Sequence, residues 1–382
     1  MDATELIEII GRDEDSRHQF KANVTNAVSL ATEMVAFANS EGGQIFIGVN
    51  NDGGISGLDR ADLGRLNQLV SNAASQMVHP PLNPTTENVA LADGLVMVIS
   101  ILPGISKPYM DNSGVIWVKN GADKRRVTSR EEMQRMFQSG GLIHADEIPA
   151  NGLTTGDLDL EYFAGFFERE YGETLEKQNL PLTRLLENMN LAKDGMLNIA
   201  GALIFAKRPQ FRLPVFIVKA VCYPGTRIDE VEYLYSDDIA GKLADVFQAT
   251  LSFVLRSISR VQLEQGVNSV GRPEVPRIVL EELLANALIH RDYFVSAPIR
   301  VFVFADRIEI INPGHLPNNL SVENIKNGNS NIRNPILASF GTKILPYRGL
   351  GNGVRRALQA YPAIEFIDDR DGNLFKVIIA LP

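Results

Sequence analysis

The sequence has a single cysteine and no long hydrophobic run. Of the 382 residues only Cys222 is a cysteine, so no disulfide can form within the chain, and a small disulfide-stabilised scaffold is excluded. The longest apolar stretches, such as Gly94 to Leu102, reach about half of the ~20 residues that a membrane helix needs. We therefore expect no membrane span. The start MDATELIEII is acidic, which predicts no secretory signal, and we expect a cytoplasmic protein.

The sequence also lacks an excess of basic charge. Its formal net charge is −9 at pH 7, which argues against a protein that coats nucleic acid through overall positive charge. Its length exceeds the roughly 100 to 200 residues of one ordinary domain, so we expect two or three domains. The balance of apolar and charged residues is that of a globular chain, and wholesale disorder is excluded.

One segment departs from the acidic composition around it. Residues 119–130, KNGADKRRVTSR, contain five basic residues and one acid, a net charge of +4. The segment is either a solvated turn between a strand and a helix or a turn that contacts phosphates. In the second case five side chains would neutralise nucleic-acid backbone charge without recognising bases, namely Lys119, Lys124, Arg125, Arg126 and Arg130.

Hydrophobic periodicity predicts a mixture of helices and strands. In the first third we expect helices over 24–39 and 62–77, strands over 44–49, 95–102 and 115–119, and a helix that begins at Ser129. Residues 145–156 are rich in Pro, Gly and Thr and predict a linker. Further on we expect helices over 157–171, 182–190 and 239–260, a β-rich run over 214–223, and a soft region over 265–276.

These patterns predict an α+β protein of three parts. The boundaries near residues 145 and 270 define an N-terminal mixed domain (1–144), an α/β middle region (145–270) that packs on the C-terminal module, and a C-terminal domain (271–382). No period of 20 to 50 residues recurs, so a repeat protein is not expected.

The C-terminal part contains a helix with a polar edge. In EELLANALIHRD, the residues Glu282, Asn286 and His290 lie one turn apart on a face beside buried leucines. An asparagine can give a carbonyl oxygen to Mg²⁺, and a glutamate can orient or deprotonate water. The alternative is an ordinary solvated helix edge.

Two glycine-bearing turns follow this helix. The first is Asn312-Pro313-Gly314 at the end of a predicted strand, and the second contains Gly349, Gly351 and Gly353 before a predicted helix over 354–360. Spaced glycines at a helix start let backbone N–H groups approach a phosphate. Each motif alone is also compatible with a flexible turn.

In this order, the motifs resemble the GHKL superfamily of ATPases. The phrases ELLANALIHRDY, EIINPGHLP and YRGLGNGVRRAL are similar to its divergent branch, the RecG-like C-terminal domain. The resemblance implies a GHKL-like α/β sandwich that binds ATP and Mg²⁺. It implies Glu282 as the water-activating catalytic residue, Asn286 as the Mg²⁺ ligand and Asn312 as the adenine-side residue. It further implies the phosphate lid Gly349, Gly351 and Gly353, with Gly314 and His290 as neighbouring nucleotide-binding residues.

The first third resembles the Schlafen AlbA-like domain, a nucleic-acid-binding module. The phrases DSRHQFK, AFANSEGGQIFIGV and VKNG with the following REE are similar to its opening, core and closing phrases. The resemblance implies DNA, or RNA, as a partner.

Two positions depart from these families, and one motif of helicase motors is absent. Gln19 stands where many Schlafen-like members have Glu, which argues against a metal-dependent nuclease because an amide supplies only a neutral oxygen. Asn312 stands where GHKL proteins have Asp, so a charge-assisted bond to adenine is lost. No phosphate-loop motif of the type G-x-x-x-x-G-K-[S/T] is present, and we expect no helicase activity.

The sequence therefore predicts an ATP-binding, DNA-binding protein, with transcriptional regulation as the leading function and a homo-oligomer as a possible assembly. The alternatives are an ATPase, a Schlafen-type metal-dependent RNase, and a non-catalytic assembly module.

Overall fold

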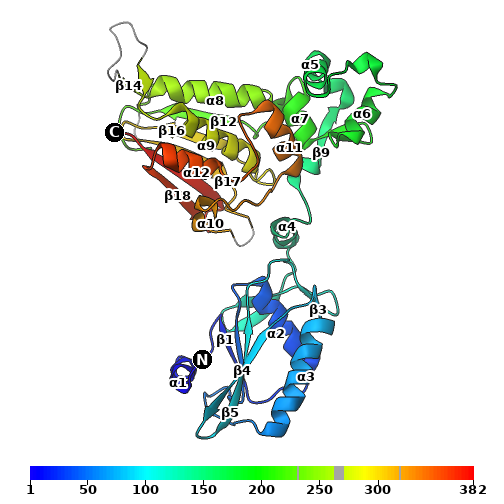
Figure 1. Ribbon diagram of the computed structural model, residues 1–382, viewed down its shortest axis with the longest axis vertical. Coiled ribbons are helices and arrows are strands. Elements are labelled where there is room, and N and C mark those ends of the chain that lie inside the picture. The colour runs from blue at the N-terminus through cyan, green and yellow to red at the C-terminus, as the bar shows by residue number, and fades with distance from the viewer. Residues whose placement is uncertain (230–231, 262–270, 318–319) are drawn as a thin grey trace. The chain divides into compact units, whose positions relative to one another are not determined.

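The computed structural model describes residues 1–229, 232–261, 271–317 and 320–382. The chain contains two compact units, Met1–Ile143 and His144–Pro382 (Figure 1). Both units combine helices with mixed sheets, and the predicted α+β class is confirmed.

The first unit is built on a four-stranded sheet. Its order is β1-β2-β5-β4, in which β1 and β2 are parallel and the other pairs are antiparallel. The strands are β1 (His18–Lys21), β2 (Gly43–Ile47), β4 (Thr85–Leu91) and β5 (Gly94–Ile101). The strands predicted over 44–49 and 95–102 correspond to β2 and β5. The edge strand β4 was not predicted, because Val89 is its only buried residue and it lacks a clear apolar alternation.

Helices cover both faces of this sheet. Helices α2 (Ala27–Asn39) and α3 (Arg60–Gln76) share one apolar core with one side of the strands, in agreement with the predicted helices. Leu6 of α1 (Ala3–Ile10) packs with Phe20, Phe46 and Val98 on the other side. The predicted cap of the last helix in the unit, α4 (Arg130–Ser139), is confirmed, since the Ser129 side chain accepts a hydrogen bond from the Glu132 backbone N–H.

The basic segment forms a β-hairpin rather than a plain turn. Strand β7 (Trp117–Asn120) pairs antiparallel with β8 (Asp123–Arg126) around Gly121, whose φ is +63°. The sequence DKRR has no apolar alternation, so only its pairing with β7 defines it as a strand. The short strands β3 (Val78–His79) and β6 (Met110–Asp111) also pair.

The second unit begins where a linker was predicted, and that prediction is wrong. Strand β9 (Pro149–Thr154) pairs with β11 (Met196–Asn198), which in turn pairs with β10 (Ala192–Lys193). The Asp146 carboxylate accepts hydrogen bonds from the backbone N–H groups of Ile336 and Leu337. The surrounding helices are α5 (Leu160–Tyr171), α6 (Leu182–Asn188), α7 (Ile199–Phe205) and the 3₁₀ turns 145–147, 155–157, 175–177 and 209–211.

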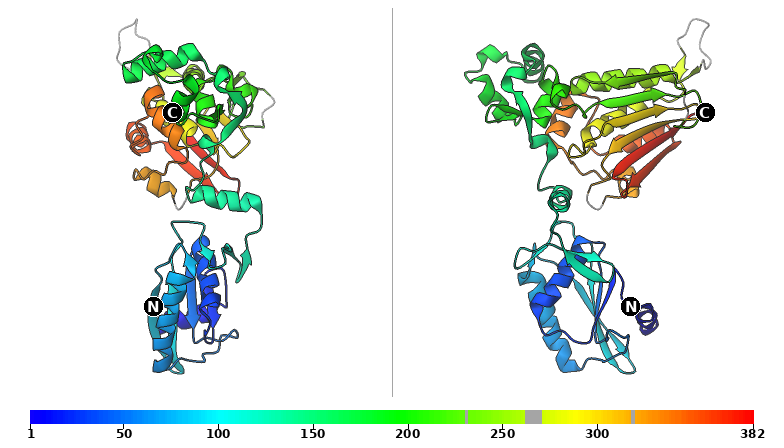
Figure 2. Two further views of the ribbon diagram at one scale, coloured as in Figure 1. Left: turned by 90° about the vertical axis from the view of Figure 1, so that its right-hand side faces the viewer. Right: turned by 180° about the vertical axis from the view of Figure 1, so that it is seen from behind.

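The main sheet of this unit has six strands and is seen from behind in Figure 2. Its order is β13-β12-β16-β17-β19-β18, with β12 and β16 as the parallel pair. The strands are β12 (Val218–Cys222), β13 (Tyr235–Ile239), β16 (Ile299–Val303), β17 (Arg307–Pro313), β18 (Ile364–Asp369) and β19 (Leu374–Ala380). Strands from both sides of the boundary predicted near residue 270 thus form one sheet.

Helices pack on one face of this sheet. Residues of α8 (Leu243–Ser257), α9 (Arg277–His290) and α12 (Gly353–Ala360) share the largest apolar core with the strands. The helix predicted over 239–260 is shorter, because Ile239 ends β13. The remaining elements are α10 (Val322–Lys326), α11 (Pro335–Ile344), β14 (Arg260–Val261) and β15 (Arg272–Pro273). Residues 265–270 of the predicted soft region lie outside the described residues.

Among the described residues, no helix combines the length and apolar character needed to cross a membrane.

Candidate functional site

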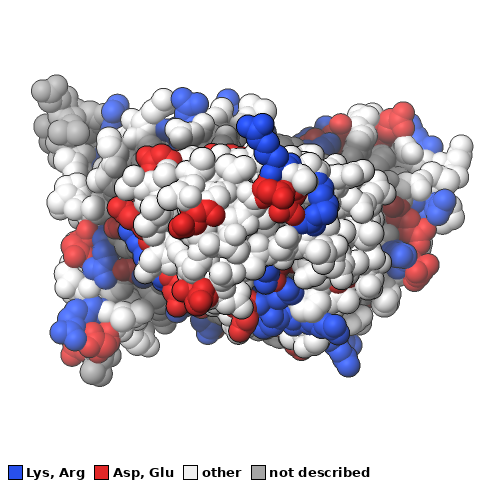
Figure 3. All heavy atoms as spheres, turned by 90° about the horizontal axis from the view of Figure 1, so that it is seen from below, with Lys and Arg blue, Asp and Glu red and all other residues white. Residues whose placement is uncertain are grey.

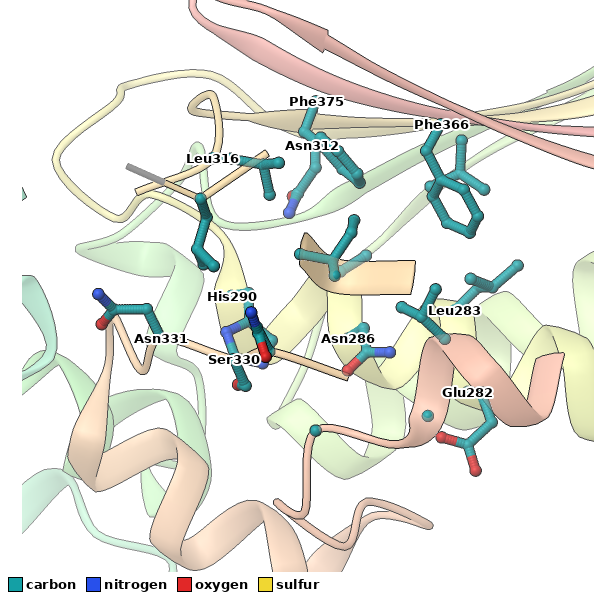
Figure 4. A pocket seen from close by; sticks show the side chains of 18 of the residues that line it. Glu282, Leu283, Asn286, His290, Asn312, Leu316, Ser330, Asn331, Phe366 and Phe375 are labelled. Atoms are coloured by element: carbon teal, nitrogen blue, oxygen red, sulfur yellow. The ribbon is translucent and has the colours of Figure 1, made fainter. Parts of the chain in front are cut away.

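Helix α9 supplies the polar edge that the sequence predicted. The helix begins after Pro276, which cannot donate a backbone hydrogen bond, and most of its residues are buried in the core. Glu282, Asn286 and His290 lie along one side of it and line a single pocket. Figure 4 shows the helix with Asn286 and Glu282 below the sheet residues Asn312 and Phe375.

The pocket brings together all the residues predicted to bind nucleotide. It has an empty volume of ≈ 1010 Å³, part of it open to solvent. The predicted residues that line it are Glu282, Asn286, His290, Asn312, Gly314, Gly349, Gly351 and Gly353. Their individual roles stay predictions.

One end of the pocket is apolar and contains Asn312. This residue is 6% exposed near the end of β17, opposite Phe375 of β19 in the sheet register. Its Oδ1 atom is buried and has no hydrogen-bond partner among the described residues. Leu283, Leu316 and Phe366 also line this space (Figure 4). A buried amide oxygen without a partner costs free energy, so this end of the pocket suits a ligand with a hydrogen-bond donor.

The other end is formed by the second glycine turn and the start of α12. Gly349 and Gly351 have φ values of +67° and +70°, which favour glycine. Position 353 leaves no room for a side chain, because a Cβ atom there would lie 2.4 Å from Glu282 Oε2 and 3.2 Å from Asn286 Nδ2. The loop therefore approaches α9 more closely than any other residue type allows.

Glu282 is buried and forms an ion pair. Its Oε1 atom lies 2.5 Å from Nη2 of Arg356, which comes from the first turns of α12. Burial raises the pKa of Glu282, although the Arg356 and Arg348 guanidinium groups oppose this effect. A carboxylate with a raised pKa suits general-base chemistry, but in this arrangement one of its oxygens is occupied by the arginine.

His290 lines the pocket as a neutral imidazole. Its Nε2 atom lies 3.1 Å from the Tyr347 hydroxyl, and burial, with the nearby Arg333, lowers its pKa to about 4. At neutral pH it can therefore exchange hydrogen bonds with a ligand but cannot supply positive charge to a phosphate.

Several lining residues were missed by the sequence analysis. Arg348 and Arg356 are the cations that line the pocket among the described residues, and Asn352 has a buried Oδ1 without a partner in the same part of the chain. All three lie in the phrase YRGLGNGVRRAL, in which the glycines were singled out and the polar residues were not. The feature of the sequence that could have identified these three residues is their position beside the glycines predicted to bind phosphate.

The oxygen donors of the pocket are compatible with Mg²⁺ bound together with phosphates. Mg²⁺ in nucleotide sites takes one or two protein oxygens, phosphate oxygens and water. The Asn286 amide makes no hydrogen bond among the described residues and lines the pocket beside the glycine turn. Asn286, with Asn352 as a second oxygen donor, would hold the ion, which would neutralise phosphate charge.

In the first unit, three of the five predicted phosphate-contacting residues have acidic or internal partners. Lys124 Nζ lies 2.5 Å from Glu33 Oε1, and Arg125 makes bonds of 2.9 and 2.7 Å to the two oxygens of Glu132. Lys119 Nζ donates to Gln19 Oε1 at 3.0 Å and lies over the Phe37 ring. Burial lowers the pKa of Lys119.

Arg126 and Arg130 are exposed, as is Arg125, which pairs with Glu132. Neither Arg126 nor Arg130 makes an ion pair with any described residue. The Arg126 guanidinium lies 5.0 Å from the centre of the Trp117 ring, whose Nε1 donates to Asp111 at 2.8 Å. Trp117 is thus held in a fixed position with cationic groups beside it.

Gln19 is engaged by its neighbours. Its Nε2 donates to Glu14 Oε1 at 2.5 Å and its Oε1 accepts from Lys119. Within the described ranges, no group of three or more His, Cys, Asp or Glu residues is arranged to hold a metal ion.

The charged side chains on the face drawn in Figure 3 are of both signs. Acidic and basic groups are scattered around a largely uncharged centre, and no continuous basic area covers that face. The face drawn there therefore offers no extended basic surface to nucleic acid.

Two family models match the chain, one in each unit. Residues 14–128 match the family described as Schlafen, AlbA_2, and residues 296–378 match the one described as "Putative ATP-dependent DNA helicase recG C-terminal". The predicted pair of a Schlafen AlbA-like domain and a RecG-type ATPase-like domain is confirmed. Together these domains suggest a nucleic-acid-associated, nucleotide-binding protein.

Two solved structures are similar to the chain. The DIP2311 protein from Corynebacterium diphtheriae is 20% identical with a TM-score of 0.47, over 99% of this chain and 80% of that one. The second is the "N-terminal Domain of Putative ATP-dependent DNA Helicase RecG-related Protein from Nitrosomonas europaea". It is 20% identical with a TM-score of 0.24, over 34% of this chain and 96% of that one. The search among curated proteins found no match.

Proposed function

We propose that the chain binds ATP in the pocket between α9, the end of β17 and the glycine turn at 349–353, and that it couples nucleotide binding to DNA binding as a transcriptional regulator. The main support for an ATP site is the buried Asn312 Oδ1 atom, which has no hydrogen-bond partner among the described residues. It lies at the apolar end of the pocket, and the glycine turn lies at the other end. The amino group of adenine is a donor that would satisfy this oxygen.

The phosphate end of the pocket supports a charged ligand. Gly349 and Gly351 lie in the turn before α12, at whose start the helix dipole favours negative charge. Arg348 and Arg356 add two positive charges. Mg²⁺ held by Asn286 would reduce the remaining negative charge of a triphosphate.

Hydrolysis of the bound ATP is the catalytic alternative. In that reaction a water oxygen bonds to the terminal phosphorus as the bond to the ADP oxygen breaks, and Glu282 accepts the proton of the water. The buried position and raised pKa of Glu282 support this role. Phosphate release that is lost in Glu282→Gln would support an ATPase, and release that survives this change would exclude Glu282 as the base.

DNA would bind at the β7–β8 hairpin and the start of α4. Arg126 and Arg130 are exposed there and form no ion pair among the described residues. Such guanidinium groups bind phosphates through charge, so the predicted affinity falls with salt. The contacts of Gln19 do not favour a Schlafen-type metal-dependent RNase. Its side-chain amide is already hydrogen-bonded to Glu14 and Lys119.

Isothermal titration with ATP, ADP and GTP in the presence of Mg²⁺ tests the nucleotide site. We expect saturable binding of ATP with one site per chain. Absence of heat with all three nucleotides, together with no change in thermal unfolding, would favour the non-catalytic assembly module instead.

A further inference from the structure

The ion pair between Glu282 and Arg356 connects the two elements that form the phosphate end of the pocket. Glu282 lies on α9 and Arg356 on α12, and the atoms Oε1 and Nη2 are 2.5 Å apart. The side chain of Glu282 is 6% exposed and that of Arg356 is 26% exposed. The pair is therefore mostly shielded from water, and its charges interact more strongly than on an open surface.

The Arg356 guanidinium has hydrogen-bonding capacity left. Its Nε atom is buried and has no partner among the described residues, although the side chain lines the pocket. A guanidinium presents five N–H donors in a planar fork that matches carboxylate and phosphate equally well. Glu282 and a terminal phosphate group would thus compete for the same cation.

We propose that Arg356 is a sensor of the terminal phosphate: in the free chain it neutralises Glu282, and when ATP is bound it moves to the terminal phosphate and releases Glu282. This inference rests on the ATP binding proposed above. The terminal phosphate carries more negative charge than one carboxylate and has three acceptor oxygens, so it is the stronger partner for the guanidinium. ADP lacks this group and leaves the ion pair in place.

The sensor makes Glu282 available only in the presence of a triphosphate. In the ion pair, one oxygen of Glu282 is bound to Arg356, and Gly353 lies so close to the other that a Cβ atom would be 2.4 Å from it. After the exchange, the carboxylate can accept a hydrogen bond from water. Arg356 is accordingly a positioning residue with respect to Glu282 and a binding residue with respect to the phosphate.

The first test compares ATP and ADP affinities in Arg356→Gln, measured by calorimetry with Mg²⁺. We expect ATP to bind roughly tenfold to a hundredfold more weakly, the range for a lost bond to a charged group, with ADP affinity almost unchanged. Arg355→Gln is the matched control, because Arg355 is the exposed neighbour on the same helix and does not line the pocket. Arg356→Lys should retain part of the preference for ATP.

A double-mutant cycle distinguishes two reasons why removal of the Glu282 charge could tighten ATP binding. One is release of Arg356, and the other is relief of repulsion between Glu282 and the phosphate. Glu282→Gln frees Arg356 and should tighten ATP binding. If the gain comes from the freed arginine, it disappears in the Arg356→Gln background. A gain of the same size in that background would contradict the proposal. The double variant also removes both buried charges, so it remains informative if Arg356→Gln alone folds poorly.

The outcomes distinguish this inference from the proposed function. Wild-type protein that binds neither ATP nor ADP would overturn both. Wild-type protein that binds both, with Arg356→Gln weakening both to the same extent, would leave the ATP site intact and overturn the sensor. A selective loss of ATP binding, absent in Arg355→Gln, would support it.

Discussion

At the scale of single residues, Gly353 is where the glycine turn that we propose to bind phosphate lies against α9. Gly353→Ala would place a Cβ atom 2.4 Å from Glu282 Oε2, so the loop must move away from the helix. We expect this variant to lose ATP binding by at least about tenfold in a calorimetric titration while the chain remains folded. Gly165→Ala in α5 is the control, because nothing lies within 4 Å of its Cβ position. That control should stabilise the helix by about 0.5–1 kcal/mol and leave binding unchanged.

In the proposed ATP site, the buried Oδ1 of Asn312 would accept a hydrogen bond from the adenine amino group. A carboxylate in its place would make a charge-assisted bond, which is roughly twice as strong as a neutral one. Asn312→Asp should therefore tighten ATP binding by about 1 kcal/mol and weaken GTP binding, because guanine presents a carbonyl oxygen at the corresponding position. Asn331→Asp adds the same charge elsewhere on the pocket wall and should not tighten ATP binding. Equal effects of the two changes on ATP would contradict the assignment of Asn312.

At the scale of secondary-structure elements, Asp146 joins the segment before β9 to the start of α11. Its carboxyl is fully buried and accepts from Ile336 N and Leu337 N, and burial raises its pKa to about 6. Because the folded pKa lies above the ordinary value of 3.8, protonation stabilises the fold, and this stabilisation is lost as pH rises through about 6.

Asp146→Asn removes this titration and should retain an acceptor for the helix. We expect the variant to be more stable than wild type at pH 7.5, by up to about 3 kcal/mol, with the difference shrinking as pH falls to 5. The free energy of unfolding can be followed by circular dichroism, while Trp117, the single tryptophan, reports the first unit by fluorescence. A difference that does not change with pH would contradict the assigned pKa.

The β7–β8 hairpin and the start of α4 form the candidate nucleic-acid interface. The double change Arg126→Ala and Arg130→Ala should weaken binding of a DNA duplex. It should also reduce the slope of log affinity against log salt concentration by the contribution of about two phosphate contacts. Lys124→Ala and Arg125→Ala should have smaller effects, since their charges are balanced by Glu33 and Glu132. Arg60→Ala, at the start of α3, is a control for the loss of one exposed charge. Equal salt slopes in all variants would exclude this interface.

The sequence predicted those elements whose apolar pattern is strong. Buried apolar residues recur regularly in helices α3 and α9 and in strands β2 and β5. The glycine turn at 349–353 is recognisable from its three closely spaced glycines. Strand β8 consists of DKRR, and β9 of PANGLT, so neither has an alternation that could reveal it. β8 is defined by its pairing with β7 just before it, and β9 by its pairing with β11.

The same distinction applies to the candidate site. Glu282, Asn286 and His290 are spaced at helical intervals, which places them together without knowledge of the fold. The contact of Arg356 with Glu282 spans 74 positions and depends on how α12 packs on α9. The acidic partners of Lys124 and Arg125 likewise became visible only in the folded unit.

At the scale of the whole molecule, the two proposed functions belong to separate units. The first matches the Schlafen AlbA_2 family model, and the second matches the RecG C-terminal ATPase-like model and contains the pocket in which we propose that ATP binds. If ATP changes the affinity for DNA, then DNA must change the affinity for ATP by the same factor. This reciprocity gives two independent measurements of one coupling free energy.

The most direct test is the affinity of a labelled DNA duplex, measured by fluorescence anisotropy at one salt concentration with saturating ATP, with ADP and without nucleotide. We expect ATP to change the DNA affinity by about fivefold or more, and Gly353→Ala to abolish this change. The same DNA affinity under all three conditions, in a protein that binds ATP, would contradict coupling between the two units.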